Sequence, residues 1–228
     1  MDELAKRRRL NRFKKISIST AVVLFVGGLI WLFYFSNLLV VKKITVVGEL
    51  QHTTAEAVVS EVDIRNGVPL ARLDQKAIQK SLAGITSVAT VEVRRVWPSE
   101  VVLAVIERTP IATSKSATGW ELVDAEGVEF GSLSQRPSEL VEVSAKTNLA
   151  LVAATEVVPN IPVWMKSELL LVQAESANDL RFLLKENRLV RFGNSQSQVE
   201  KFRVLKTLLT IPASVYDVSA PNLPITRK

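Results

Sequence analysis

The feature that most restricts this chain is an uncharged apolar stretch near its N-terminus. It runs from Ile16 to Val41, is 26 residues long and has a pair of lysines on each side. As an α-helix it would extend about 39 Å, which exceeds the hydrocarbon core of a bilayer, about 30 Å. Aromatic residues gather toward its C-terminal end, where such rings favour the headgroup level. We therefore predict a single transmembrane helix over residues 16–41.

A cleaved secretory signal peptide is the competing interpretation of this stretch. Signal peptides have a shorter apolar region that ends in a small-x-small cleavage site. No such site follows Tyr34. The length of the stretch and the missing site both favour a retained membrane anchor.

The positive charge of the chain is concentrated before the apolar stretch. The whole protein has 29 Lys and Arg against 23 Asp and Glu, a net charge of +6 and a pI of about 9.6. Residues 1–15 hold seven of the cations and two of the anions, whereas the rest of the chain is close to neutral. Because cationic flanks stay inside, we expect residues 1–15 to be a cytoplasmic basic tail and the bulk of the chain to lie outside the plasma membrane. No basic face remains there for nucleic acid.

The cysteine and histidine content limits the chemistry that this chain can support. No cysteine and one histidine are present, which excludes disulfides, thiolate zinc sites, iron–sulfur clusters and a cysteine nucleophile. His52 has no catalytic motif around it, and no P-loop, H-E-x-x-H or G-x-S-x-G sequence occurs. We expect no enzyme activity, no cofactor and no metal site. A pair of carboxylates that meets only in the fold stays open.

Residues 42–112 have the pattern of a small α+β domain. A β-branched strand is followed by a helix that starts at a Thr53–Glu56 capping box and by a second helix that Asp74 caps. Two strands follow, at 88–96 and 101–108, and the second is apolar on both faces, which predicts a central position in the sheet. This β-α-α-β-β order, directly after one membrane span, resembles a POTRA domain.

The hairpin of this domain carries a longer motif. From Val93 to Ala112 the sequence is VRRVWPSEVVLAVIERTPIA. It is similar to the V-x-R-x-W-P…V-x-E-R-x-P-x-A hairpin of the FtsQ/DivIB family of bacterial cell-division proteins. The matching residues are Arg95, Trp97, Pro98, Glu107, Arg108 and Pro110. Taken singly, these residues also fit a sheet edge, a turn and a solvated pair of charges, so the resemblance rests on the whole string.

Residues 113–228 are expected to form a mixed β-sheet domain with flanking helices. A hairpin over 119–130 resembles the W-x-L-V-D-x-x-G-x-x-F element that follows the POTRA unit in the same family. The matching residues are Trp120, Asp124 and Gly127, the last at a turn position that favours positive φ. A helix over 148–159, a meander of short strands between 169 and 192, and a helix from a capping box at Ser197 are predicted to follow.

The last predicted strand, Val215–Ser219, is followed by Pro221 and Pro224, which cannot donate to a further ladder partner. We therefore predict an edge strand. The family resemblance implies that a strand of FtsB/DivIC adds to this edge by β-augmentation. The implied partner-binding residues are Val215, Tyr216, Asp217, Val218, Ser219 and Ala220. Many family members carry D-x-R-Y at the place of the last four, and an edge strand without a partner is the alternative.

The resemblance implies a bitopic scaffold of the bacterial divisome, located at the division septum. Such a protein links and positions early and late cell-division proteins, recruits the FtsB/DivIC and FtsL pair with other divisome membrane proteins, and regulates septal peptidoglycan synthesis. The alternative is a membrane-anchored extracytoplasmic cell-wall enzyme that uses an unrecognised carboxylate pair. A secretion-pathway POTRA chaperone fits less well, because such proteins repeat the POTRA unit and continue into a membrane barrel.

Overall fold

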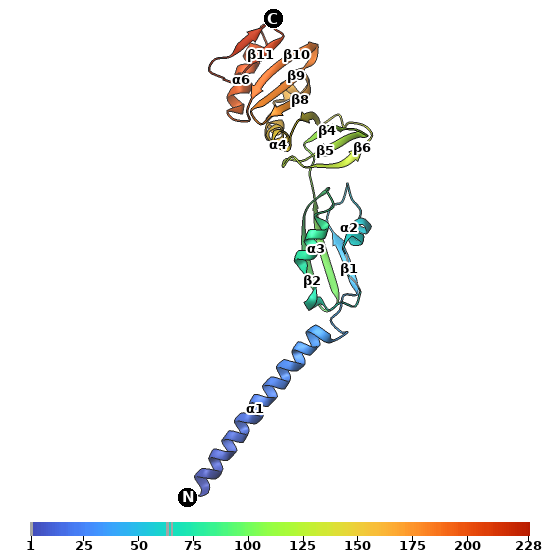
Figure 1. The fold of residues 1–228 in the computed structure, drawn as a ribbon, viewed down its shortest axis with the longest axis vertical. Helices are drawn as coiled ribbons and strands as arrows, with labels where there is room; N and C mark the ends of the chain where they lie inside the picture. Colours follow the sequence, from blue (N-terminus) through green and yellow to red (C-terminus); the bar gives the residue numbers. More distant parts are fainter. Residues whose placement is uncertain (1, 63, 65) are drawn as a thin grey trace. The chain divides into compact units, whose positions relative to one another are not determined.

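The computed structural model describes residues 2–62, 64 and 66–228, and the chain divides into two compact units, Met1–Glu107 and Arg108–Lys228. The first unit begins with one long helix, α1 (Asp2–Phe35), drawn in blue in Figure 1. Its segment Ser17–Phe35 has a mean hydropathy of 2.2 and is long and apolar enough to cross a membrane. The helix therefore fits a transmembrane anchor.

The end of α1 differs from the prediction. The helix stops at Phe35 and not at Val41. Val40 and Val41 are 6% and 0% exposed, because their side chains are buried in the domain that follows. Val40 and Val41 are therefore apolar because they belong to that domain's interior, and the predicted span of 16–41 extends six residues past the end of the helix.

A three-stranded sheet with two helices makes up the rest of the first unit. Its elements are β1 (Lys43–Val47), α2 (Ala55–Glu61), η1 (Leu70–Arg72), α3 (Gln75–Leu82), β2 (Val88–Val96) and β3 (Glu100–Glu107). The strand order β1-β3-β2 puts β3 in the centre, with β1 parallel to it and β2 antiparallel. The predicted β-α-α-β-β order and the central position of the last strand are confirmed.

Helix caps explain where α2 and α3 begin. Asp74 caps α3 as predicted and accepts hydrogen bonds from the N–H groups of Lys76 and Ala77. The predicted capping box at Thr53 is wrong by one residue, since Thr54 is the N-cap of α2. The backbone N–H of Thr53 is instead bound by the carboxylate of Glu107, 2.8 Å away.

The second unit is built on one mixed nine-stranded sheet. Its strands are β4 (Ala112–Ser116), β5 (Gly119–Val123), β6 (Glu129–Leu133), β7 (Val141–Ala145), β8 (Leu169–Ser176), β9 (Asp179–Leu184), β10 (Arg188–Gly193), β11 (Val215–Asp217) and β12 (Ile225–Arg227). The spatial order is β12-β11-β10-β9-β8-β7-β4-β5-β6. Residues 108–112, which the sequence assigned to the first domain, belong here, because Ile111 bonds to Val123 and Ala112 begins β4.

Helices supply the rest of the second core. They are α4 (Asn148–Val157), η2 (Val158–Asn160), α5 (Val163–Lys166), η3 (Lys185–Asn187) and α6 (Gln198–Leu208). Phe202 of α6 packs its ring 5.0 Å from that of Phe192 and 6.1 Å from that of Phe182, which joins the helix to the buried face of β9 and β10. The predicted sheet domain with flanking helices is confirmed, although Ser197 makes no capping bond and lies at φ 52°.

Candidate functional site

Strand β11 is not the sheet edge that the sequence predicted. It pairs in parallel with β10 on one side and antiparallel with β12 on the other. Val215, for example, lies between Leu189 and Arg227. The edge prediction for Val215–Ser219 is therefore wrong. Pro221 and Pro224 end the strand but lie in the turn that brings the chain back as β12.

The side chains predicted to bind a partner serve the domain's interior instead. Tyr216 is 1% exposed, donates its hydroxyl proton to the carbonyl of Ile211 at 2.8 Å and accepts from the N–H of Ala213 at 3.2 Å. Val218 is 0% exposed and its N–H donates to the carbonyl of Arg191. The Tyr216 bonds hold the loop after α6 against β11, and the Val218 bond continues the pairing with β10.

The remaining three predicted residues shape the turn that leads to β12. Asp217 accepts hydrogen bonds from both the N–H and the hydroxyl of Ser219, the latter at 2.6 Å. Ala220 accepts from the N–H of Leu223. None of the three is aligned along an open strand edge, so β12 presents that edge instead.

The open edge at this end of the sheet is β12. The carbonyl of Arg227 accepts from the N–H of Ser214, so the main chain of Arg227 faces inward. Strand alternation then turns the N–H and carbonyl of Thr226 outward, away from β11. Two apolar side chains flank this edge, Leu223 at 78% and Ile225 at 52% exposed. The β-branched pair Ile225-Thr226 directly after Pro224 is a sequence signal that favours a strand, although three residues are too few for a periodic pattern.

A row of apolar side chains leads across the sheet to this edge. Leu171, Leu183, Leu189 and Val215 are cross-strand neighbours on β8 to β11, and Arg227 continues the row on β12. They lie on the face opposite the buried residues Val172, Phe182, Val190 and Tyr216. We call these four residues the outer row. All four are half-buried, and a shallow cavity of about 490 Å³ lies over part of this face.

Charged side chains border the outer row. Arg181 forms two hydrogen bonds with Asp179, at 2.9 and 2.5 Å, which hold the pKa of that carboxyl below its usual value. Arg191 lies between Arg181 and Asp217 in the neighbouring cross-strand row. The face is thus an apolar strip beside a charged strip, a pattern that suits an amphipathic strand or helix.

Glu107 of the family motif has a structural partner. Its carboxylate accepts hydrogen bonds from the backbone N–H groups of Gln51, His52 and Thr53, at 2.7 to 3.2 Å. Charge-assisted bonds of this kind fix a loop that would otherwise leave three donors unpaired. Glu107 therefore ties the end of β3 to the loop before α2, and the interpretation as a solvated charge is wrong.

Arg108 and Asp124 form a second motif contact. The guanidinium of Arg108 lies 2.5 Å from the carboxylate of Asp124 and 3.1 Å from that of Glu126. Asp124 is 5% exposed and also accepts from the N–H groups of Glu126 and Val128. Gly127 completes the turn at φ 75°, as predicted from its position. The two parts of the motif thus meet in one buried ion pair.

The other motif residues lie in strands or next to their ends. Trp97 and Pro98 form the tip between β2 and β3, joined by a cis peptide bond, and Arg95 donates from Nη2 to the carbonyl of Leu73. Pro110 is half-buried just before β4, and Trp120 on β5 has the guanidinium of Arg136 5.8 Å from its ring. Trp97 stays 45% exposed and is not part of the POTRA core.

Metal-binding chemistry finds no support in the geometry. Within residues 2–62, 64 and 66–228, no group of three His, Cys, Asp or Glu side chains could hold a metal ion. His52 is exposed, and its backbone N–H is bound by Glu107. The features that stand out are the open edge of β12 and the outer row beside it.

Comparison with known proteins gives this architecture a family. A family model described as "POTRA domain, FtsQ-type" matches residues 39–108. The cell division protein FtsQ of Streptomyces bingchenggensis is 30% identical over 234 residues, which cover 96% of this chain and 88% of that protein. The chain belongs to the FtsQ family of cell division proteins. FtsQ of Mycobacteroides abscessus, 28% identical over 226 residues, matches 98% of this chain and 73% of its own length.

FtsQ membership confirms the resemblance drawn from the hairpin motif. The matched range begins at residue 39, in agreement with the burial of Val40 and Val41 in the POTRA core. As FtsQ homologues are cell division proteins, a role in the divisome is supported for this chain.

Proposed function

We propose that this FtsQ-family protein is a bitopic scaffold of the divisome. Residues 1–15 lie in the cytoplasm, the apolar segment Ser17–Phe35 of α1 spans the plasma membrane, and the POTRA and sheet domains lie outside at the septum. The protein links early and late division proteins, recruits FtsB/DivIC with FtsL and thereby regulates septal peptidoglycan synthesis. The basic residues that precede the apolar segment of α1 support this orientation.

The observation that carries partner recruitment is the free edge of β12. An incoming strand would pair with the outward N–H and carbonyl of Thr226 and extend the nine-stranded sheet by one strand. Its alternate side chains would meet Ile225 and Arg227 on the outer face, next to the outer row. Val215–Ala220 then act indirectly, because they hold β12 in place.

Catalysis is not part of this proposal. The carboxylates of Asp124 and Glu126 approach the same guanidinium, and Asp124 is buried beneath it. A glycosidase pair must instead face a sugar across an open cleft, with one carboxylic acid kept protonated. The two carboxylates therefore support a structural role and do not support the cell-wall enzyme.

The recruitment proposal is tested by blocking the edge of β12. Thr226→Pro removes the outward N–H, whereas Thr226→Val keeps it at a similar side-chain volume. The full chain is co-purified with FtsB/DivIC and FtsL from cells. We expect Thr226→Pro to capture about tenfold less partner, which corresponds to about 1.4 kcal/mol of binding free energy. Thr226→Val should capture as much partner as the parent protein. Equal capture by both variants, with unchanged melting temperatures, contradicts edge pairing.

The divisome role has its own test in cells. A fluorescent full-length fusion should gather at the septum, and depletion of the protein should block septation. If the fusion is spread evenly over the membrane and septation is normal after depletion, the scaffold proposal is wrong.

A further inference from the structure

The end of the POTRA domain nearest α1 is fixed to that helix by a very short link. The N–H of Leu70 donates to the carbonyl of Leu39, and Val41 exchanges hydrogen bonds with the loop at Gly67 and Val68. The chain therefore joins the fold at Leu39, four residues after the end of α1. A link from Phe35 to Leu39 reaches at most about 15 Å. This end of the domain must lie close to the membrane surface at any angle of the helix.

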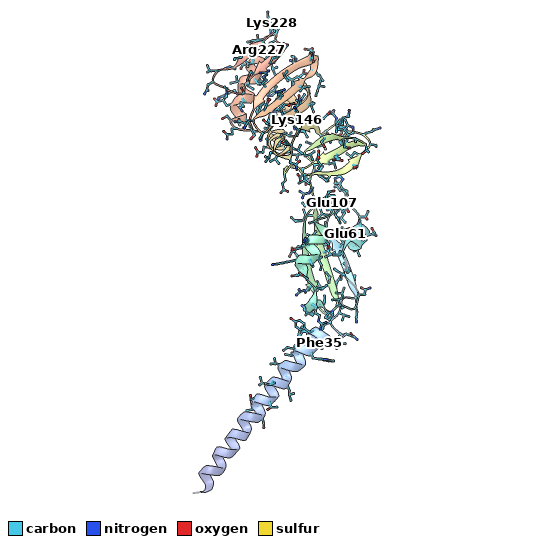
Figure 2. All side chains as sticks on the ribbon, viewed as in Figure 1. Phe35, Glu61, Glu107, Lys146, Arg227 and Lys228 are labelled. Carbon is cyan, nitrogen blue, oxygen red and sulfur yellow. The ribbon has the colours of Figure 1, made fainter. Side chains whose placement is uncertain are left out.

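The tip of the POTRA hairpin lies at the same end. The N–H groups of Lys42 and Lys43 both donate to the carbonyl of Ser99, at 2.9 and 3.3 Å. The exposed ring of Trp97 stands edge-on to the ring of Phe33 of α1, with 5.4 Å between centroids. Figure 2 shows Phe35 and Glu107 at opposite ends of the POTRA domain. The tip thus carries an amphipathic ring at the depth where α1 leaves its apolar segment.

Three cations lie at this end of the domain. Lys42, Lys43 and Arg72 are exposed, and the guanidinium of Arg72 lies 4.6 Å from the ring of Phe35. Glu100 offsets Lys43 through an ion pair of 3.1 Å. Exposed cations beside tryptophan are the side chains that meet phosphate and glycerol groups at a bilayer surface.

We propose that this end of the POTRA domain, formed by Lys42, Arg72 and the Trp97–Ser99 tip, lies in the headgroup layer and binds anionic phospholipid of the membrane that α1 spans. The inference rests on the membrane anchoring in the proposed function. The occupant is lipid because the short link keeps this surface against the bilayer. The contact restricts tilting of the POTRA domain about residues 36–38 and gives the exposed motif residue Trp97 a role.

The test uses the absence of cysteine from the natural chain. Full-length single-cysteine variants Leu29→Cys in α1, Val96→Cys beside Trp97 and Glu49→Cys at the far end of β1 are labelled with one fluorophore. They are reconstituted in phosphatidylcholine vesicles with or without phosphatidylglycerol. Quenching by lipids with a nitroxide in the acyl chain or in the headgroup then reports depth. The far end lies roughly 20 Å along the strand from Lys43, which makes Glu49→Cys the matched control.

We expect acyl-chain quenching at position 29, headgroup quenching at position 96 and little of either at position 49. Equal weak quenching at 96 and 49, with strong quenching at 29, overturns the lipid contact and leaves the anchor intact. No quenching at 29 refutes the anchor itself, and the lipid contact with it.

A second set of variants tests the named side chains on the Val96→Cys background. Lys42→Ser and Arg72→Ser should each weaken headgroup contact in phosphatidylglycerol vesicles by about fivefold, the effect of one interfacial cation. Lys80→Ser, which removes an exposed cation from α3, should change nothing. Trp97→Ala should reduce contact and Trp97→Phe should restore part of it. Identical quenching in all variants and in both lipid mixtures refutes specific binding of anionic lipid.

Discussion

The ion pair between Arg108 and Asp124 offers the sharpest test of how the family motif works. Asp124→Asn keeps the side-chain shape and leaves Oδ1 able to accept from the N–H groups of Glu126 and Val128. It removes the charge and turns an amide N–H₂ toward the guanidinium. Because Asp124 is 5% exposed and the side chain of Arg108 is 16% exposed, we expect a loss of about 3 kcal/mol of unfolding free energy, typical of breaking a buried pair.

Two further variants bracket this value. Asp124→Ala also loses the two backbone bonds and should cost about 2 kcal/mol more. Glu126→Gln should cost no more than about 0.5 kcal/mol, because the side chain of Glu126 is 78% exposed.

The assay is thermal unfolding of the full chain followed by tryptophan fluorescence. Trp31→Phe and Trp97→Phe in the background leave only Trp120 and Trp164, which report the second unit. At about 4 °C per kcal/mol, Asp124→Asn should melt roughly 12 °C below its parent. A change in melting temperature of no more than about 2 °C would refute a stabilising role of this ion pair.

Two more predictions concern the same unit. Gly127→Ala should lower the unfolding free energy by about 2 kcal/mol, because φ is 75° and the new methyl would lie 2.9 Å from Cγ2 of Val152. Gly131→Ala has φ 58° but makes only an ordinary contact. It should lower the unfolding free energy by about half as much in the same melting assay. Asp179→Asn should cost less than about 1 kcal/mol at pH 7, because Asp179 is 41% exposed. The hydrogen bond from Arg181 lowers the pKa of Asp179, so the pair stabilises above the unfolded pKa, and the difference between Asp179→Asn and its parent in urea unfolding should shrink as the pH falls below that pKa.

The sequence by itself determined the parts of this protein that depend on local signals. The apolar stretch and its basic flank predict a membrane helix, Asp74 predicts the start of α3, and Gly127 predicts a turn with positive φ. Alternating and two-sided apolar patterns predict β2 and β3 with their positions in the sheet. Each of these signals lies within a few residues of the element that it specifies. The family motif lies in the same part of the chain, over β2, β3 and the β5 hairpin.

The tertiary structure alone decided what those elements contact. Glu107 binds N–H groups more than fifty residues away, and Arg108 meets Asp124 across a turn. The strand at the open edge is β12, which has three residues and is too short for a periodic pattern to predict it. Tyr216 is buried because its side chain lies on the sheet face that packs into the core of the second unit. Pairing between distant segments is set by which partner buries the most surface and satisfies the most hydrogen bonds, and no local pattern encodes that competition.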